Sequence, residues 1–270
     1  MITSPDNAYV RLIRSLCADR QVRRSERLFV IEGVRLVNAA LAARATLRLV
    51  LYDPQHLADQ VAAYPLLDHL ATLPNAVAAG PRALAAAADT VTPQGVVAVV
   101  HWPTFAPRPG LRLVLDAIQD PGNVGTLLRS AEAAGVGWVL CSKGTADPYS
   151  PKVVRSAMGA HFSLPLQTDM TWEAIGAALH EVPHIYAAAA DGPSPYYAVD
   201  WHPPVALLIG SEAHGIGSEG RALATQSITI PMLGRSESLN AGVAGSIILF
   251  EALRASGVVT PFGGKKRTTA

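Results

Sequence analysis

The amino-acid sequence predicts an α/β protein built on a parallel sheet with helices on both faces. Half of the 270 residues are hydrophobic and only 16% are charged, so the chain can bury a sizeable core. Several short apolar runs contain no polar residue, as strands buried on both faces do. These runs alternate with segments whose apolar residues recur at helical spacing, which favours parallel strands joined by helices.

The first hundred residues predict a small α/β module. Its expected helices are residues 8–18, 34–43 and 83–88, and its expected strands are 29–33, 47–52 and 95–100. A proline-rich stretch follows, with three prolines between residues 103 and 109. Proline-rich segments are extended and serve as spacers between domains. We therefore expect an N-terminal domain at residues 1–102 and a linker at 103–110.

The α/β alternation resumes after the linker and predicts a second, larger domain at residues 111–258. Its expected strands are residues 111–115, 138–141, 184–189, 205–209 and 227–230. Its expected helices are residues 123–134, 152–158, 172–180 and 240–255. Gly242 and Gly245 lie inside the last helix and predict close packing of its backbone. The final segment, residues 259–270, is expected to be a flexible tail.

Composition argues against several classes of protein. Cys17 and Cys141 are too few for a disulfide framework and lack the spacing of a metal site. No apolar run approaches the roughly 20 residues that span a bilayer, and residues 1–14 lack the apolar core of a signal peptide. We therefore expect a cytoplasmic protein with reduced thiols.

Positive charge is concentrated near the N-terminus. Residues 1–50 contain nine arginines and four acids, a local net charge of +5, whereas the whole chain carries +1. The densest part of this region holds Arg20, Arg23, Arg24 and Arg27. Such a cluster is typical of a phosphate-binding patch, although a solvated helix face would account for it equally well.

Three segments that follow predicted strands contain the residues that could carry chemistry. They are residues 120–129, 208–217 and 230–240. Because the carboxyl ends of parallel strands meet at one edge of a sheet, the three loops could converge on one small-molecule pocket. Glycines in the second segment would let a ligand approach the backbone. That segment lacks the glycine pattern of a dinucleotide-binding oxidoreductase.

Simpler structural roles are available for most polar residues in these segments. Asn123, Ser238 and Asn240 each stand near the start of a predicted helix, where such residues commonly cap it. Glu212 could cap the segment that follows it. Arg129 is harder to explain in this way, because an arginine on so apolar a helix usually has an anionic partner or a function.

The order, spacing and identity of these residues resemble the three motifs of the SpoU/TrmH family of RNA ribose 2′-O-methyltransferases. Residues 147–160 are similar to the stretch that the family carries between its first two motifs, and residues 27–33 are similar to part of a small ribosomal-protein-like RNA-binding domain. The resemblance implies a SPOUT fold with a C-terminal deep trefoil knot, an exception to the rule against knots. It also implies an S-adenosylmethionine (SAM) cofactor, no metal, and a homodimer with the active site near the interface.

The resemblance assigns roles to individual residues. Catalytic roles fall on Asn123, Arg129, Glu212, Ser238 and Asn240. Cofactor binding falls on Gly210, Ile230, Met232 and Leu239. RNA binding is expected of Arg20, Arg23, Arg24, Arg27 and Arg155. Because a free guanidinium, with a pKa above about 12, is a poor base, we expect the motif-one arginine to hold the target phosphate and 2′-oxygen, or to lose its proton only with help from that phosphate.

We expect 2′-O-methylation of a structured RNA, with 23S rRNA as the favoured substrate because the N-terminal module resembles rRNA-modifying members. A tRNA is the alternative substrate, and a self-protecting resistance methyltransferase is a third form of the same chemistry. A non-catalytic RNA-binding or ribosome-assembly factor is a different class, and the intact catalytic set counts against it. One departure stands out: many relatives carry a second serine in motif three where this chain has Gly242.

Overall fold

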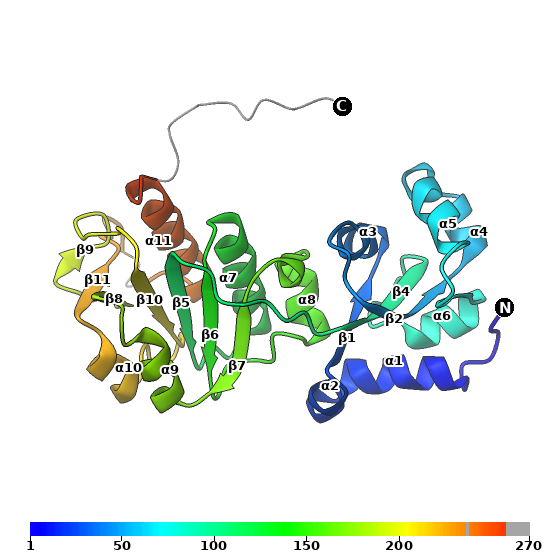
Figure 1. Cartoon of the computed structure of the whole chain (residues 1–270), viewed down its shortest axis with the longest axis horizontal. Helices are drawn as coiled ribbons and strands as arrows, with labels where there is room; N and C mark the ends of the chain where they lie inside the picture. Colours follow the sequence, from blue (N-terminus) through cyan, green and yellow to red (C-terminus); the bar gives the residue numbers. More distant parts are fainter. Residues whose placement is uncertain (236–237, 258–270) are drawn as a thin grey trace.

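The computed structural model describes residues 1–235 and 238–257 and forms two α/β units that lie side by side (Figure 1). The N-terminal unit contains a four-stranded sheet and the C-terminal unit a seven-stranded sheet. The expected flexible tail, residues 259–270, lies outside the described residues.

The N-terminal sheet has the strand order β1-β4-β2-β3, with β4 antiparallel to both neighbours and β2 parallel to β3. The strands are β1 (Leu28–Glu32), β2 (Leu47–Tyr52), β3 (Ala76–Ala78) and β4 (Val96–His101). One face of the sheet packs against α1 (Ala8–Ala18), α2 (Arg20–Glu26) and α6 (Pro81–Ala87). The other face packs against α3 (Val34–Ala42), α4 (Pro54–Ala58), η1 (Val61–Ala63) and α5 (Tyr64–Leu70).

The C-terminal sheet is parallel throughout, with the strand order β7-β6-β5-β10-β8-β11-β9. Its strands are β5 (Leu111–Asp116), β6 (Trp138–Ser142), β7 (Leu166–Met170), β8 (His184–Ala188), β9 (Ser194–Pro195), β10 (Val205–Gly210) and β11 (Gln226–Thr229). Successive residues of a strand point to opposite faces. Accordingly, Leu207 packs in one core and Leu208 in the other.

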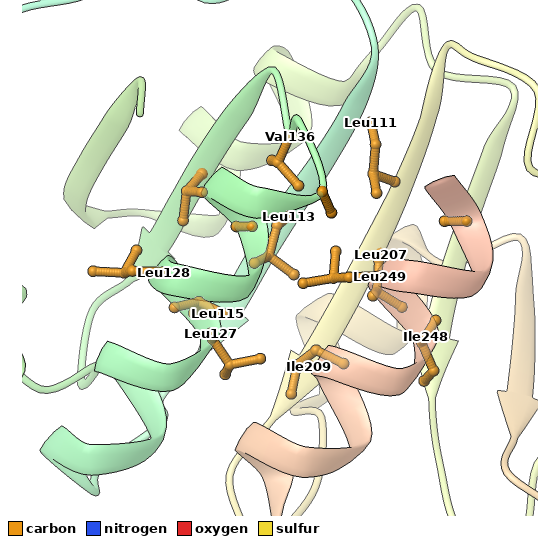
Figure 2. Close-up of a cluster of buried hydrophobic side chains, with 14 of the residues drawn as sticks. Leu111, Leu113, Leu115, Leu127, Leu128, Val136, Leu207, Ile209, Ile248 and Leu249 are labelled. Carbon is orange, nitrogen blue, oxygen red and sulfur yellow. The ribbon is translucent and has the colours of Figure 1, made fainter. Parts of the chain in front are cut away.

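Helices cover both faces of this sheet. The first face carries α7 (Pro121–Ala133), α8 (Pro151–Ala157), η2 (Ala160–Phe162) and α11 (Ala241–Ala255). Figure 2 shows leucines and isoleucines of α7 and α11 packed in this core with those of β5 and β10. The second face carries α9 (Trp172–Leu179) and α10 (Ser218–Leu223). Helix α8 joins the two units, because Val153 packs into the C-terminal core and Val154 into the N-terminal one.

The close packing predicted for the last helix is confirmed. A Cβ atom at Gly245 would overlap the side chain of Leu127, so the two helices α7 and α11 approach closely at this point. At the next residue of α11, the hydroxyls of Ser246 and Ser130 lie 2.7 Å apart and form a hydrogen bond between the same helices.

The parallel sheet is also confirmed, but the sequence misses several elements. Strand β7 carries a polar run, residues 167–169, and so lacks the continuous apolar pattern of a buried strand. The short helices α2, α4, α5 and α10 span seven residues or fewer, too short for a helical period to stand out. The sequence starts α7 at residue 123, whereas the structure begins it at Pro121 with Asp120 as its cap.

Candidate active site

A cavity of about 430 Å³ opens at the carboxyl ends of β8, β10 and β11. The second and third motifs meet here, as the sequence predicts for loops at one edge of a parallel sheet. All four residues expected to bind the cofactor line it, together with three of the five expected catalytic residues: Gly210, Ile230, Met232, Leu239, Glu212, Ser238 and Asn240. The start of α11 closes one side through Ala241, Ala244 and Ile248.

The loop after β10 is held in a tight turn that only glycine at its base permits. The backbone amides of Ser211 and Gly215 each donate a hydrogen bond to the other residue's carbonyl, at 3.0 and 2.8 Å. A Cβ atom at Gly210 would overlap the backbone of Gly215 and Ile216. The loop therefore presents backbone groups to the cavity at close range, an arrangement that suits a ligand recognised by main-chain hydrogen bonds.

The first motif reaches this loop through one side chain. Asn123 is only 8% exposed, and its side-chain amide donates a hydrogen bond to the carboxylate of Glu212. Asn123 does not cap α7, since its backbone amide donates to the carboxylate of Asp120 at 2.9 Å. Its amide side chain is thereby free to fix the loop after β10 rather than the end of its own helix.

The third motif approaches the same point. Asn240 caps α11, as the sequence predicts for a residue in this place, because its side-chain oxygen accepts from the amide of Val243 at 3.2 Å. A Cβ atom at Gly242 would lie 3.1 Å from the side-chain oxygen of Asn123 and 3.2 Å from that of Asn240. The missing side chain at Gly242 thus gives both asparagine oxygens room beside the helix.

Asp116 is a further residue at this site, and sequence reasoning overlooks it. It is buried at the end of β5, where one carboxylate oxygen accepts from the amide of Gly217 at 2.7 Å and the other from the hydroxyl of Ser142 at 3.1 Å. These bonds tie the end of the glycine-rich loop to the sheet. The signal in the sequence is an acid that directly follows a strand of apolar residues.

Arg129 does not line the cavity. It lies exposed on α7, in a separate concavity that also contains Arg35 of the N-terminal unit. Among the residues that the structure describes, none forms a hydrogen bond or an ion pair with its guanidinium. One chain therefore brings Asn123, Glu212, Ser238 and Asn240 together and leaves Arg129 apart from them.

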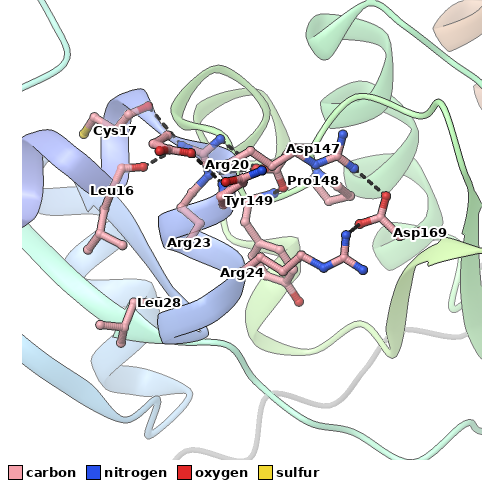
Figure 3. A network of polar contacts seen from close by, with 12 residues as sticks. Leu16, Cys17, Arg20, Arg23, Arg24, Leu28, Asp147, Pro148, Tyr149 and Asp169 are labelled. Carbon is pink, nitrogen blue, oxygen red and sulfur yellow. Dashed lines mark hydrogen bonds and ion pairs between the residues drawn. The ribbon is translucent and has the colours of Figure 1, made fainter.

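Three of the arginines expected to bind RNA lie on α2 and form ion pairs with the C-terminal unit (Figure 3). Arg20 and Arg24 both contact Asp169, at 2.6 and 3.1 Å. Arg23 is buried, and all its side-chain nitrogens are engaged: two contact Asp147 at 2.7 Å and the third donates to backbone carbonyls of α1. Because Arg23 has no free edge for a phosphate, we no longer expect it to contact RNA.

The other two arginines expected to bind RNA also lie at the junction. Arg155 of α8 pairs with Asp89, and the guanidinium of Arg27 lies 5.2 Å from the ring centre of Trp102. The Trp102 ring in turn stacks on Tyr149 with ring centres 4.0 Å apart. Ion pairs and stacked rings from both sides therefore fix how the two units sit against each other.

His161 completes the packing of this junction as a neutral group. Its ring is buried against Phe29 and Tyr149, and Nε2 lies 2.7 Å from the carbonyl oxygen of Pro148. Burial lowers the pKa of His161 to about 4, since a charged imidazolium would be desolvated there.

No helix in the part of the chain that the structure describes is long and apolar enough to cross a membrane. The same residues contain no group of three or more histidines, cysteines or acids placed to hold a metal ion.

The family models and known proteins that this chain matches are named as methylases, methyltransferases or their substrate-binding domains. A model of the SpoU rRNA methylase family matches residues 110–250, and one of the MRM3-like substrate binding domain matches residues 7–98. The 23S rRNA (guanosine(2553)-2′-O)-methyltransferase RlmP of Bacillus subtilis is 30% identical, over 92% of this chain and 97% of that protein.

Two solved structures share the fold along nearly the whole chain. The SpoU methyltransferase AviRb from Streptomyces viridochromogenes, in complex with the cofactor AdoMet, gives a TM-score of 0.81 at 30% identity and covers 92% of this chain and 97% of its own. The AdoMet-bound rRNA methyltransferase from Sinorhizobium meliloti gives a TM-score of 0.80 at 31% identity, with 94% and 97% covered. Together with the motif loops and the cavity, these matches show that the chain belongs to the SpoU rRNA methylase family.

Proposed function

We propose that this protein transfers a methyl group from SAM to a ribose 2′-hydroxyl of ribosomal RNA, with 23S rRNA as the favoured substrate. The observation that carries the proposal is the cavity at the ends of β8, β10 and β11, which all four expected cofactor residues line. Its volume lies within the range of small-molecule sites, and its wall combines apolar side chains with exposed backbone. Gly210 lines this cavity, and the backbone of Gly215 and Ile216 packs directly against it, so main-chain groups of the loop lie at the cavity wall.

The residues around the cavity would mainly position the reactants. Bound SAM would supply a methyl group on a positively charged sulfur, which leaves as a neutral thioether. Asn123 and Glu212 fix the loop beneath the cavity through their hydrogen bond. Arg129 would hold the target phosphate and the 2′-oxygen, since guanidinium groups bind phosphate oxygens well. Alignment of attacking oxygen and methyl carbon is the main contribution in such a displacement.

We also propose a homodimer, which supplies the arginine that the cavity lacks. Helix α11 exposes an apolar stripe at Val243, Ile247 and Phe250, which are 47%, 37% and 49% exposed. The spacing of four and three residues places all three on one helix face. Helix α7, which bears Arg129, packs directly beside α11. Pairing through this stripe would bring Arg129 of one protomer toward the cavity of its partner.

Replacing Ile247 with glutamate is expected to separate the protomers. A buried unpaired charge costs several kcal/mol, so the dimer dissociation constant should rise by about 100-fold or more. Light scattering would measure the mass, with Val91→Glu, an exposed apolar residue of the N-terminal unit, as the matched control. A monomeric wild-type protein, or an Ile247→Glu variant that remains dimeric, would contradict the proposed interface.

The substrate is tested by methyl transfer from labelled SAM to total rRNA and, separately, to total tRNA. The RNA should come from cells that lack this protein, so that its sites are unmodified. We expect label in rRNA, lost in Arg129→Ala. Label in tRNA alone would favour the alternative substrate. No transfer and no SAM binding, with RNA binding intact, would favour a non-catalytic factor.

The proposed function also bears on the roles of the two domains, the knot and the cellular location. We propose that residues 1–102 form the RNA substrate-binding domain and residues 111–258 the methyltransferase domain; the matched ranges 7–98 and 110–250 support this division. The family resemblance supports a deep trefoil knot in the C-terminal part of the chain. A ribosomal substrate supports a cytoplasmic location.

A further inference from the structure

A groove runs along the junction of the two units, apart from the proposed SAM cavity. Its larger part has a volume of about 440 Å³ and lies between α3, α7 and the turn after α8. A smaller part of about 200 Å³ continues it past the end of α3 to residues 101–105. The two parts share Ala43 and Phe162, and neither shares a lining residue with the SAM cavity.

The groove is positively charged along its length. Arg129 and Arg35 line the larger part, and Arg44 lines the smaller part. All three are exposed, and within residues 1–235 and 238–257 their guanidinium groups have no hydrogen-bond or ion-pair partner. The only acid in the lining is Glu132, whose carboxylate accepts a hydrogen bond from Ser163 at 3.2 Å. Three unpaired cations against one acid favour a polyanionic occupant.

The floor of the groove is largely apolar and offers one exposed phenylalanine ring. Six alanines line the larger part: Ala39, Ala42, Ala43, Ala133, Ala157 and Ala160. Phe105 is 41% exposed at the far end, and Phe162 lies where the two parts meet. Arginines above an apolar floor, with the exposed Phe105 ring at one end, match single-stranded nucleic acid, whose phosphates pair with cations while its bases stack on aromatic groups.

We propose that this groove binds a single-stranded segment of the RNA substrate that flanks the methylated nucleotide. Arg35 and Arg44 would contact successive phosphates and Phe105 would stack on a base. A duplex keeps its bases inside and could not stack one on this ring. Arg129 ends the path, so RNA in the groove would lead to the arginine that the proposed reaction needs. The inference therefore rests on the proposed function and names the RNA conformation that it requires.

The ion pairs at the junction support a preformed groove. Arg23, Arg155 and their partners Asp147 and Asp89 link the two units. Since Arg35 belongs to one unit and Arg129 to the other, these links set the spacing of the groove's cations before RNA arrives. The N-terminal unit would thus contribute Arg35 to a path that ends on the methyltransferase unit.

Charge reversal at Arg35 tests the proposal, with Arg82→Glu as the matched control. Both arginines are exposed second residues of helices, α3 and α6, and these helices lie on opposite faces of the N-terminal sheet. An acid near a helix N-terminus is favourable, so both variants should keep their fold. Fluorescence anisotropy would measure binding of labelled oligouridine, its duplex with oligoadenine, and 23S rRNA transcribed in vitro.

We expect Arg35→Glu to weaken oligouridine and rRNA binding by about 10-fold, and to reduce the slope of log affinity against log salt by roughly 0.7 per lost phosphate contact. Arg82→Glu should change neither. Phe105→Ala should weaken binding by about 5- to 10-fold without changing that slope, since it removes stacking alone. SAM affinity, measured by calorimetry, should be unchanged in all three variants.

The possible outcomes distinguish a failure of the proposed RNA-binding groove from a failure of the proposed methyl transfer. Equal RNA affinity of Arg35→Glu and Arg82→Glu would contradict the proposed RNA-binding groove. A duplex that binds as tightly as oligouridine, with the same dependence on Arg35, would contradict it as well. Wild-type methylation of rRNA in either case would leave the proposed function standing. Dependence of RNA binding on Arg35 in a protein that transfers no methyl group would support the groove and reject the reaction.

Discussion

Replacing Gly210 with alanine is expected to weaken SAM binding by about 10- to 100-fold, and methyl transfer by at least as much. The added methyl group would overlap the backbone of Gly215 and Ile216, which cannot rotate away as a side chain can. The turn after β10 must therefore shift, and such overpacking typically costs about 1–3 kcal/mol. The same shift would move Glu212 away from Asn123, so both sides of the cavity would change together.

Calorimetric titration with SAM would measure this effect, and a thermal melt would show that the variant is folded. Gly234→Ala is the matched control, because a Cβ atom there would have no atom of the described residues within 4 Å apart from its own chain neighbours. It lies in the loop between β11 and α11 and should bind SAM like the wild-type protein. Wild-type affinity in Gly210→Ala would show that SAM binds elsewhere.

Replacing Arg23 with alanine is expected to lower the free energy of unfolding by about 3–5 kcal/mol, since it leaves the nearly buried Asp147 carboxylate without its cation. The carbonyls of Leu16 and Cys17 would also lose their donor. By contrast, Arg20→Ala removes a partly exposed ion pair with Asp169 and should cost about 1 kcal/mol or less. Urea unfolding of the two variants would measure the difference.

This comparison also separates an RNA-binding role of Arg23 from a structural role. If Arg23 served RNA alone, its replacement would weaken RNA binding and leave stability unchanged. A loss of stability confined to Arg23→Ala would instead establish that the arginine holds the two units together. Equal stability of the two alanine variants would contradict the structural role.

The sequence predicts the continuously apolar strands and the three motif loops well because their signals are local. Val205 to Ile209 is a continuous apolar run, and the run continues directly into Gly210, so strand and turn can be read together. The convergence of motifs two and three also follows, since all the strands of the sheet are parallel. The cap at Asn240 is equally local, because a capping side chain contacts its own helix.

The sequence does not reveal partners that are distant along the chain. Arg23 and Asp147 stand 124 residues apart, and nothing near either residue indicates the other. Clustered arginines therefore predict a phosphate patch, while the fold gives three of them carboxylate partners in the second unit. Arg35 shows the reverse case, because only the packing of the two units places it in a groove with Arg129.

The position of the transferred methyl group tests the central claim most directly. A ribose methylated at O2′ cannot attack the adjacent phosphate, so alkali leaves a dinucleotide uncut at that site. The measurement is alkaline digestion of rRNA labelled from SAM by the wild-type protein. The account predicts label in alkali-resistant dinucleotides, absent when Arg129 is alanine. Label recovered only in mononucleotides would place the methyl group on a base and contradict it.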